Sequence, residues 1–150
     1  MAVRRLLRWL LAALGLMAVL LLAAWWAARP AVPDAFYAAP PDLPATPGQL
    51  LRHEPFERRV PAGARAWRIL YTTTRADGIN AVVSAIVMVS RKEAATGARP
   101  VVVWTHGTTG VASGCAPSLL DDPFANVPAL PALLDQGWVY VATDYVGQGT

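Results

Sequence analysis

The sequence predicts an α/β fold preceded by a hydrophobic N-terminal helix, and three observations support the α/β part. Four segments are rich in β-branched and aromatic residues, as strands are: 66–74, 81–89, 100–104 and 138–142. Asp77-Gly78 separates the first two and indicates a hairpin turn. A helical stretch at 126–136 separates the last two, and a strand–helix–strand unit implies a parallel pair with a right-handed crossover.

The individual elements carry further local signals. Segment 81–89 is almost entirely apolar, so we expect both of its faces to be covered. The helix at 126–136 has Asn126 as a candidate cap, Pro128 in its first turn and Gly137 after its end.

The N-terminal region predicts a helix that enters or crosses a membrane. Trp9 to Ala28 contains no charged residue, and 20 residues of helix rise about 30 Å, the thickness of a bilayer core. The arginines before this run, at positions 4, 5 and 8, place the N-terminus in the cytoplasm. Trp25 and Trp26 fall near the outer end, where aromatic rings favour the membrane interface.

Two interpretations of residues 1–29 stay open. One is an uncleaved signal anchor. The other is a cleaved signal peptide, although the apolar core of such peptides is usually only about 7–15 residues. Pairs of small residues that could be cleaved occur at Ala23-Ala24 and Ala27-Ala28. Either interpretation places everything after Arg29 outside the cytoplasm, as a membrane-anchored or a secreted domain.

The overall charge of +3 reports this orientation and not an affinity for nucleic acid. The leader contains four of the 13 basic residues and none of the ten acidic ones. The rest of the chain therefore has nine basic and ten acidic residues, without a basic stripe, which excludes a nucleic-acid partner.

Residues 30–49 form a predicted proline-rich linker, with six prolines between Pro30 and Pro47. Such density disfavours helix and sheet. The segment is either an extended connector that holds the domain away from the membrane or an arm packed along the domain surface. The folded domain is expected over residues 50–150.

Two glycine-rich loops follow predicted strands, His106–Gly110 after the third and Asp144–Gly149 after the fourth. In sheets of this kind, ligands bind at the carboxyl ends of the strands. The pattern therefore predicts a binding or catalytic edge where these two loops meet.

The stretch Val101–Gly110, with the sequence VVVWTHGTTG, resembles the oxyanion loop of α/β-hydrolases. Acyl transfer builds negative charge on a carbonyl oxygen, which correctly placed backbone N–H groups stabilise. In that superfamily one N–H donor comes from the loop after the third strand.

The wider pattern resembles the secretory lipase family of that superfamily. The His-Gly loop is followed by Cys-Ala-Pro-Ser at 115–118 and by Asp-Tyr-Val-Gly-Gln-Gly at 144–149, and the resemblance covers roughly residues 50–150. It implies the N-terminal half of an α/β-hydrolase sheet, a hairpin plus parallel strands, with 138–142 lying between 81–89 and 100–104. The implied activity is hydrolysis of carboxylic esters, often acylglycerols, by a Ser-Asp-His triad.

The resemblance also assigns the candidate site residues. Thr108 or Thr109 would donate an oxyanion N–H, while Gly107 and His106 would shape the loop, with a role of His106 as a base as the alternative. Asp144 is expected to organise its own loop. The Gly-x-Ser-x-Gly elbow of the nucleophile does not occur in the sequence, so no catalytic triad is expected within residues 1–150.

We therefore expect an N-terminal part of a longer extracytoplasmic lipase or esterase, inactive alone, whose partners are its lipid or other ester substrate and the membrane. The alternatives are a peptidase or acyltransferase on the same fold, since fold does not fix substrate, or a non-catalytic membrane-anchored module. No metal or cofactor is expected. The lone cysteine, Cys115, is expected to be structural, with a disulfide to a cysteine outside these residues as one option.

Overall fold

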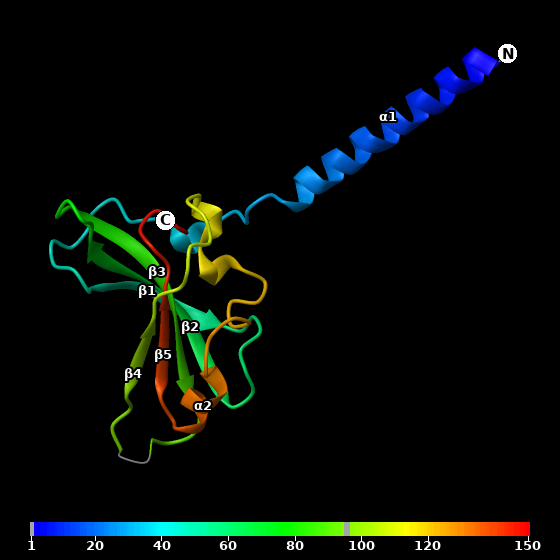
Figure 1. Cartoon of the computed structure of the whole chain (residues 1–150). Helices are drawn as coiled ribbons and strands as arrows, with labels where there is room; N and C mark the ends of the chain where they lie inside the picture. Colours follow the sequence, from blue (N-terminus) through cyan, green and yellow to red (C-terminus); the bar gives the residue numbers. More distant parts are fainter. Residues whose placement is uncertain (1, 95–96) are drawn as a thin grey trace. The chain divides into compact units, whose positions relative to one another are not determined.

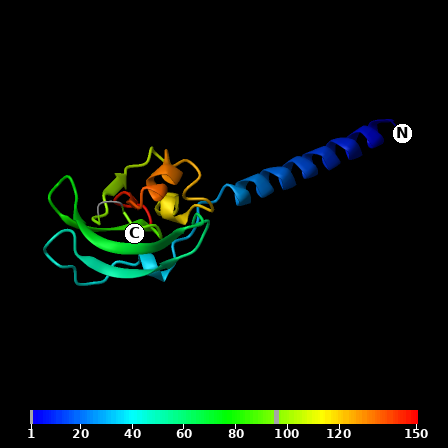
Figure 2. The same ribbon diagram turned by 90° about the horizontal axis from the view of Figure 1, so that it is seen from below.

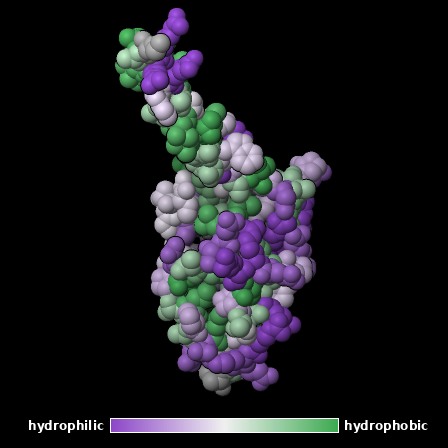
Figure 3. Space-filling view, turned by 90° about the vertical axis from the view of Figure 1, so that its right-hand side faces the viewer, coloured by the Kyte–Doolittle hydropathy of each residue, from purple (hydrophilic) through white to green (hydrophobic). Residues whose placement is uncertain are grey.

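The computed structural model describes residues 2–94 and 97–150, which form two units that divide after Pro30. The first unit is the helix α1, Ala2–Ala27, none of whose residues is buried. Figure 3 shows its apolar surface, with hydrophilic side chains toward the N-terminal end. The helix includes Arg4, Arg5 and Arg8 and the predicted apolar run up to Ala27.

By length and composition α1 can cross a membrane, and a signal sequence at an N-terminus has the same properties. At its C-terminal end the Arg29 guanidinium lies 3.9 Å from the centre of the Trp25 ring. A cation over an aromatic face is a stabilising contact. The chain thus begins with an exposed apolar helix that fits a signal sequence or a membrane anchor.

The second unit is built on a five-stranded mixed sheet (Figure 1). Its strands lie in the order β1-β2-β3-β5-β4. Their bounds are β1 Leu50–Phe56, β2 Ala64–Thr74, β3 Asn80–Ser90, β4 Val101–Trp104 and β5 Val139–Thr143. The pairs β1–β2, β2–β3 and β3–β5 are antiparallel, whereas β4 and β5 run parallel. The expected position of 138–142 between 81–89 and 100–104 is confirmed.

The predicted hairpin is β2–β3, paired without interruption from Ala64↔Ser90 to Thr74↔Asn80. Its turn contains Gly78, whose φ of +80° is a conformation that glycine adopts without steric cost. The Arg75 N–H donates to the Ile79 carbonyl at 2.9 Å and closes the loop. The Asp77-Gly78 signal thus identified this turn correctly.

Strand β1 was not predicted from the sequence. It pairs only with β2, and Pro55 lies within it. An edge strand tolerates proline and charged side chains because one side of its backbone needs no partner. For the same reason its sequence lacks the alternation and β-branched content that reveal inner strands.

The crossover helix α2, Leu130–Asp135, is shorter than the predicted 126–136. Asn126 does not cap it, and Ala129 precedes it with a φ of +55°. Pro131, rather than Pro128, occupies the first turn. A proline ring disfavours helical geometry in the residue before it and offers no N–H, so Pro131 fits only at the start of the helix. The expected glycine at the C-terminal end is Gly137, with φ +74°.

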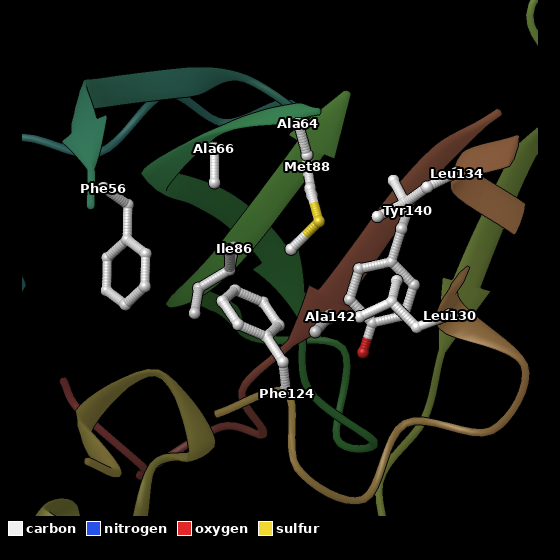
Figure 4. Packing of buried hydrophobic residues seen from close by; sticks show 10 residues of the cluster. All are labelled: Phe56, Ala64, Ala66, Ile86, Met88, Phe124, Leu130, Leu134, Tyr140 and Ala142. Atoms are coloured by element: carbon white, nitrogen blue, oxygen red, sulfur yellow. The ribbon is translucent and has the colours of Figure 1, made fainter. Parts of the chain in front are cut away.

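The main core lies on the face of the sheet that α2 covers (Figure 4). Strand residues such as Ile86, Met88 and Tyr140 pack there against Leu130 and Leu134 of α2. Phe56 and Phe124 meet edge to face, with ring centres 6.2 Å apart. Most of β3 is buried, as its apolar sequence predicted.

The proline-rich segment packs against the sheet, which is one of its two predicted alternatives. It contains the 3-10 helix η1, Ala35–Tyr37, capped by the Asp34 carboxylate, which accepts from the Phe36 N–H at 2.9 Å. Phe36 and Tyr37 are buried against Leu70 and Val82. Figure 2 shows the curved hairpin around which these segments are arranged.

Candidate functional site

The two glycine-rich loops begin at the same edge of the sheet. Strands β4 and β5 are in parallel register from Val101↔Val139 to Trp104↔Ala142. The residues after each strand therefore emerge side by side, at the yellow-green and red ends of these strands in Figure 1. The sequence-based expectation that both loops meet at a carboxyl edge is confirmed.

Tyr145 of the second loop holds His106 of the first. Their rings stack with centres 4.1 Å apart and an angle of 20°. The Tyr145 hydroxyl also donates to the His106 carbonyl oxygen at 2.5 Å. The position of the His106 backbone is thus fixed by a residue 39 positions away in the sequence.

Gln148 makes a second connection between the loops. Its Nε2 donates to the Gly110 carbonyl at 2.8 Å and to the Thr109 hydroxyl at 3.2 Å, and its Oε1 accepts from the Tyr145 N–H at 3.3 Å. The side chain is buried. A buried amide satisfied on both of its ends is a rigid spacer. Sequence reasoning assigned Gln148 no role of its own, although the parallel strand pair already placed it opposite the first loop.

The contacts of His106 indicate the tautomer of its neutral ring. Its Nδ1 lies 2.6 Å from the carbonyl oxygen of Gly107, which can only accept, so Nδ1 carries the hydrogen. In the neutral ring Nε2 is then an acceptor, and it is buried without a partner in the part of the chain that the structure describes. No serine or threonine hydroxyl within that part contacts it. These contacts shape the loop.

The backbone between Gly107 and Gly110 is open at this edge. Gly107, Thr108 and Thr109 are exposed, and their N–H groups donate to no other described residue. The Thr109 hydroxyl donates to the Cys115 carbonyl at 2.8 Å, and this hydrogen bond fixes the Thr109 side chain. Gly110 has a φ of +129°, and a Cβ atom there would lie 2.5 Å from the Cys115 sulfur. Cys115 is a free thiol.

A buried polar cluster anchors the second loop. The Asp144 carboxylate accepts from the Ser84 and Ser118 hydroxyls, each at 2.5 Å, and from the Ser118 N–H at 3.0 Å. The Tyr37 hydroxyl lies 2.9 Å from the Ser118 hydroxyl. Burial raises the pKa of Asp144, although its three hydrogen bonds favour the ionised form. Asp144 therefore links its loop to β3 and to the proline-rich segment.

A pocket of about 240 Å³ lies beside the first loop. His106, Gly107 and Thr109 form one side of it. Most of the remaining wall is apolar and comes from the end of β4, from η3, Pro117–Leu119, and from the segment between η3 and α2. The described residues include no group of three or more side chains that could hold a metal ion.

Comparisons with solved structures show similarity to a lipase and an esterase. Candida antarctica lipase A in its closed state matches with a TM-score of 0.62 and 24% identity, over 74% of this chain and 29% of that chain. A second structure of the same lipase gives 0.59 and 23%, over 74% and 28%. The rice cell wall degrading esterase LipA from Xanthomonas oryzae, in a ligand-bound form, gives 0.52 and 23%, over 69% and 30%.

No family model matches the chain, and no curated protein sequence does. The chain spans less than a third of the length of each of the three matched structures. At these identities the matches establish the fold: the mixed sheet corresponds to part of the α/β-hydrolase fold of lipases.

Proposed function

We propose that these 150 residues are the N-terminal part of an extracytoplasmic serine ester hydrolase, a lipase or esterase that acts on carboxylic esters including acylglycerols. The observation that carries the proposal is the His106–Gly110 loop. It lies at the carboxyl end of β4, its N–H groups are open, and a neighbouring loop holds it in place.

The physical argument concerns charge in the transition state. Attack on an ester places negative charge on the carbonyl oxygen, and a fixed N–H stabilises that charge without reorganising. Thr108 and Thr109 offer N–H groups that no described residue uses. In our proposal one of them is an oxyanion donor, whereas Gly107 and His106 shape the loop.

The nucleophile comes from elsewhere in this proposal. A Gly-x-Ser-x-Gly elbow does not occur in the sequence, and Ser84 and Ser118 are buried donors to Asp144. A serine, an acid and a histidine encoded after Thr150 would complete the triad. The helix α1, as an anchor or a cleaved signal, would place the enzyme outside the cytoplasm.

The test is to express the gene with the sequence that follows Thr150 and to assay nitrophenyl esters, peptide amides and acyl transfer to alcohols. We expect ester hydrolysis that a serine-directed phosphonate abolishes. The 150-residue chain alone is the control and should show no turnover. Amide hydrolysis or acyl transfer as the main activity, or a longer product without an elbow serine, would overturn the proposal.

A further inference from the structure

We propose that the pocket beside His106 binds the acyl chain of the substrate, and that this chain is uncharged and has up to about eight carbon atoms, the length that the pocket volume accommodates. The inference rests on the proposed ester hydrolase function and adds the class of acyl group.

The walls of the pocket suit a hydrocarbon chain. Its apolar wall consists of Trp104 at the end of β4 together with Leu120, Val127, Pro117 and Pro123. Trp104 and Val127 also pack against the main core, so these walls are fixed by folding. Burial of one methylene group on such a surface strengthens binding about fourfold.

The position of the pocket ties it to the reacting group. His106, Gly107 and Thr109 belong both to the pocket wall and to the loop with the open N–H groups. In our proposal the chain lies against Trp104 with its carboxyl end beside that loop. An ester bound in this way would present its carbonyl oxygen to the oxyanion donors.

The volume limits the length of the chain. Pockets for drug-sized ligands range from about 300 to 1,000 Å³, and this one has about 240 Å³. One water molecule takes up about 30 Å³ in the liquid, so the pocket equals the space of roughly eight waters. A methylene group needs similar room, and a longer chain would extend beyond the described walls.

The charge at the pocket selects against anionic acyl groups. Asp122 and Asn126 are the polar wall residues that do not belong to the loop, and both are exposed. The Asp122 carboxylate repels a second carboxylate, such as the free end of a dicarboxylic half-ester. A neutral acyl chain meets no such repulsion.

The first experiment compares kcat/KM for nitrophenyl esters from acetyl to palmitoyl, with the longer gene product. We expect an optimum at about four to eight carbons and a decline beyond it, because the pocket volume accommodates no longer chain. Leu120→Trp, which fills the pocket, should lower the ratio of kcat/KM for the octanoyl ester to kcat/KM for the acetyl ester at least tenfold. Val111→Trp is the matched control, because Val111 is 95% exposed and lies outside the pocket wall.

A second variant tests the charge argument. Asp122→Asn should raise kcat/KM for a nitrophenyl hemisuccinate several-fold relative to the butyryl ester. An unchanged chain-length profile in Leu120→Trp, an optimum at palmitoyl in the wild type, or an unchanged hemisuccinate ratio in Asp122→Asn would each overturn the inference.

A direct measurement separates this inference from the proposed function. The 150-residue chain in nanodiscs is photolabelled with methyl octanoate that carries a diazirine at its chain end. Labelled peptides should contain Trp104 or residues 117–127, and labelling should fall in Leu120→Trp but not in Val111→Trp. Labelling that is equal in both variants overturns the pocket, whereas a longer gene product that hydrolyses no ester of any length overturns the proposed function alone.

Discussion

The two faces of the sheet differ most clearly at β4 and β5. On one face, Trp104 and Tyr140 pack against the main core under α2. On the other, Val101 and Val103 are each 60% exposed and Val139 is only half-buried. Both faces are apolar in sequence, so composition does not explain why one is packed and the other is open.

The difference lies in what covers each face. The helix α2, the 3-10 turns and the proline-rich segment pack on the face of Tyr140, whereas no described helix or strand packs on Val101 and Val103. No described strand pairs with the outer side of β4 either. Sheets with parallel strands are normally covered by helices on both faces. The apolar sequence of the open face is therefore suited to a second layer of protein.

The largest of the effects predicted here is expected on the covered face, at Gly149. A Cβ atom there would lie 2.7 Å from Tyr37 and 2.9 Å from the Ser84 hydroxyl, at a φ of +78°. Gly149→Ala should cost about 2–5 kcal/mol, from left-handed backbone strain and overpacking together. Gly147→Ala is the matched control, since its φ is +86° and nothing lies within 4 Å.

For the control we expect only the strain, about 1–2 kcal/mol. Urea unfolding of both variants in detergent, followed by tryptophan fluorescence, measures the difference. Equal destabilisation by the two alanines would show that the contact of Gly149 with Tyr37 and Ser84 contributes nothing.

The second prediction concerns the edge where the two faces end. In the enzyme that we propose, Thr108→Pro or Thr109→Pro removes one N–H, and the variant that removes the oxyanion donor should lose about a hundredfold or more in kcat. Thr108→Ala and Thr109→Ala keep the N–H and should keep most of the activity. Steady-state kinetics with a butyryl ester decides. Full kcat in both proline variants, with an unchanged circular dichroism spectrum, would refute the oxyanion assignment.

The third prediction uses the buried carboxyl group of the covered face. Because burial raises the pKa of Asp144 in the folded state, folding favours its protonated form. The related stability is fully present below the unfolded pKa of about 3.9 and is lost as pH rises through the raised folded value. Asp144→Asn cannot titrate and should lack this loss.

The measurement is the unfolding free energy of wild type and Asp144→Asn between pH 4 and pH 8. Their difference should shift in favour of the variant as pH rises, while all other groups cancel. A difference that shifts in favour of the wild type would mean that the hydrogen bonds from Ser84 and Ser118 outweigh the cost of burial.

Which elements could be predicted from the sequence also depended on burial. The inner strands, their order and the meeting of the two glycine-rich loops were predictable, because apolar runs and glycine signals reflect local backbone and burial. Edge strand β1 and the start of α2 were not, since an edge strand tolerates polar residues and Pro131 competed with Pro128 for the first turn. The hydrogen bonds of Gln148 to the first loop and the Ser84–Asp144–Ser118 cluster depend on contacts between residues 38 and 60 positions apart. A single sequence carries no pattern for such contacts.

The smallest effect on stability is expected on the open face. Val103→Lys places a charge where the side chain is already exposed, so the free energy of unfolding should change by no more than about 0.5 kcal/mol. Solubility should nevertheless improve, because β4 is an apolar edge strand with an unpaired side, and a lysine on such a strand hinders pairing between chains. Val102→Lys is the matched control: Val102 is opposite Tyr140 on the packed face and half-buried, so a charge there should destabilise the domain. Sedimentation of both variants in detergent, together with amide exchange along 101–104, gives the answer. Equal aggregation of wild type and Val103→Lys would show that the edge of β4 is not the surface through which the chains associate.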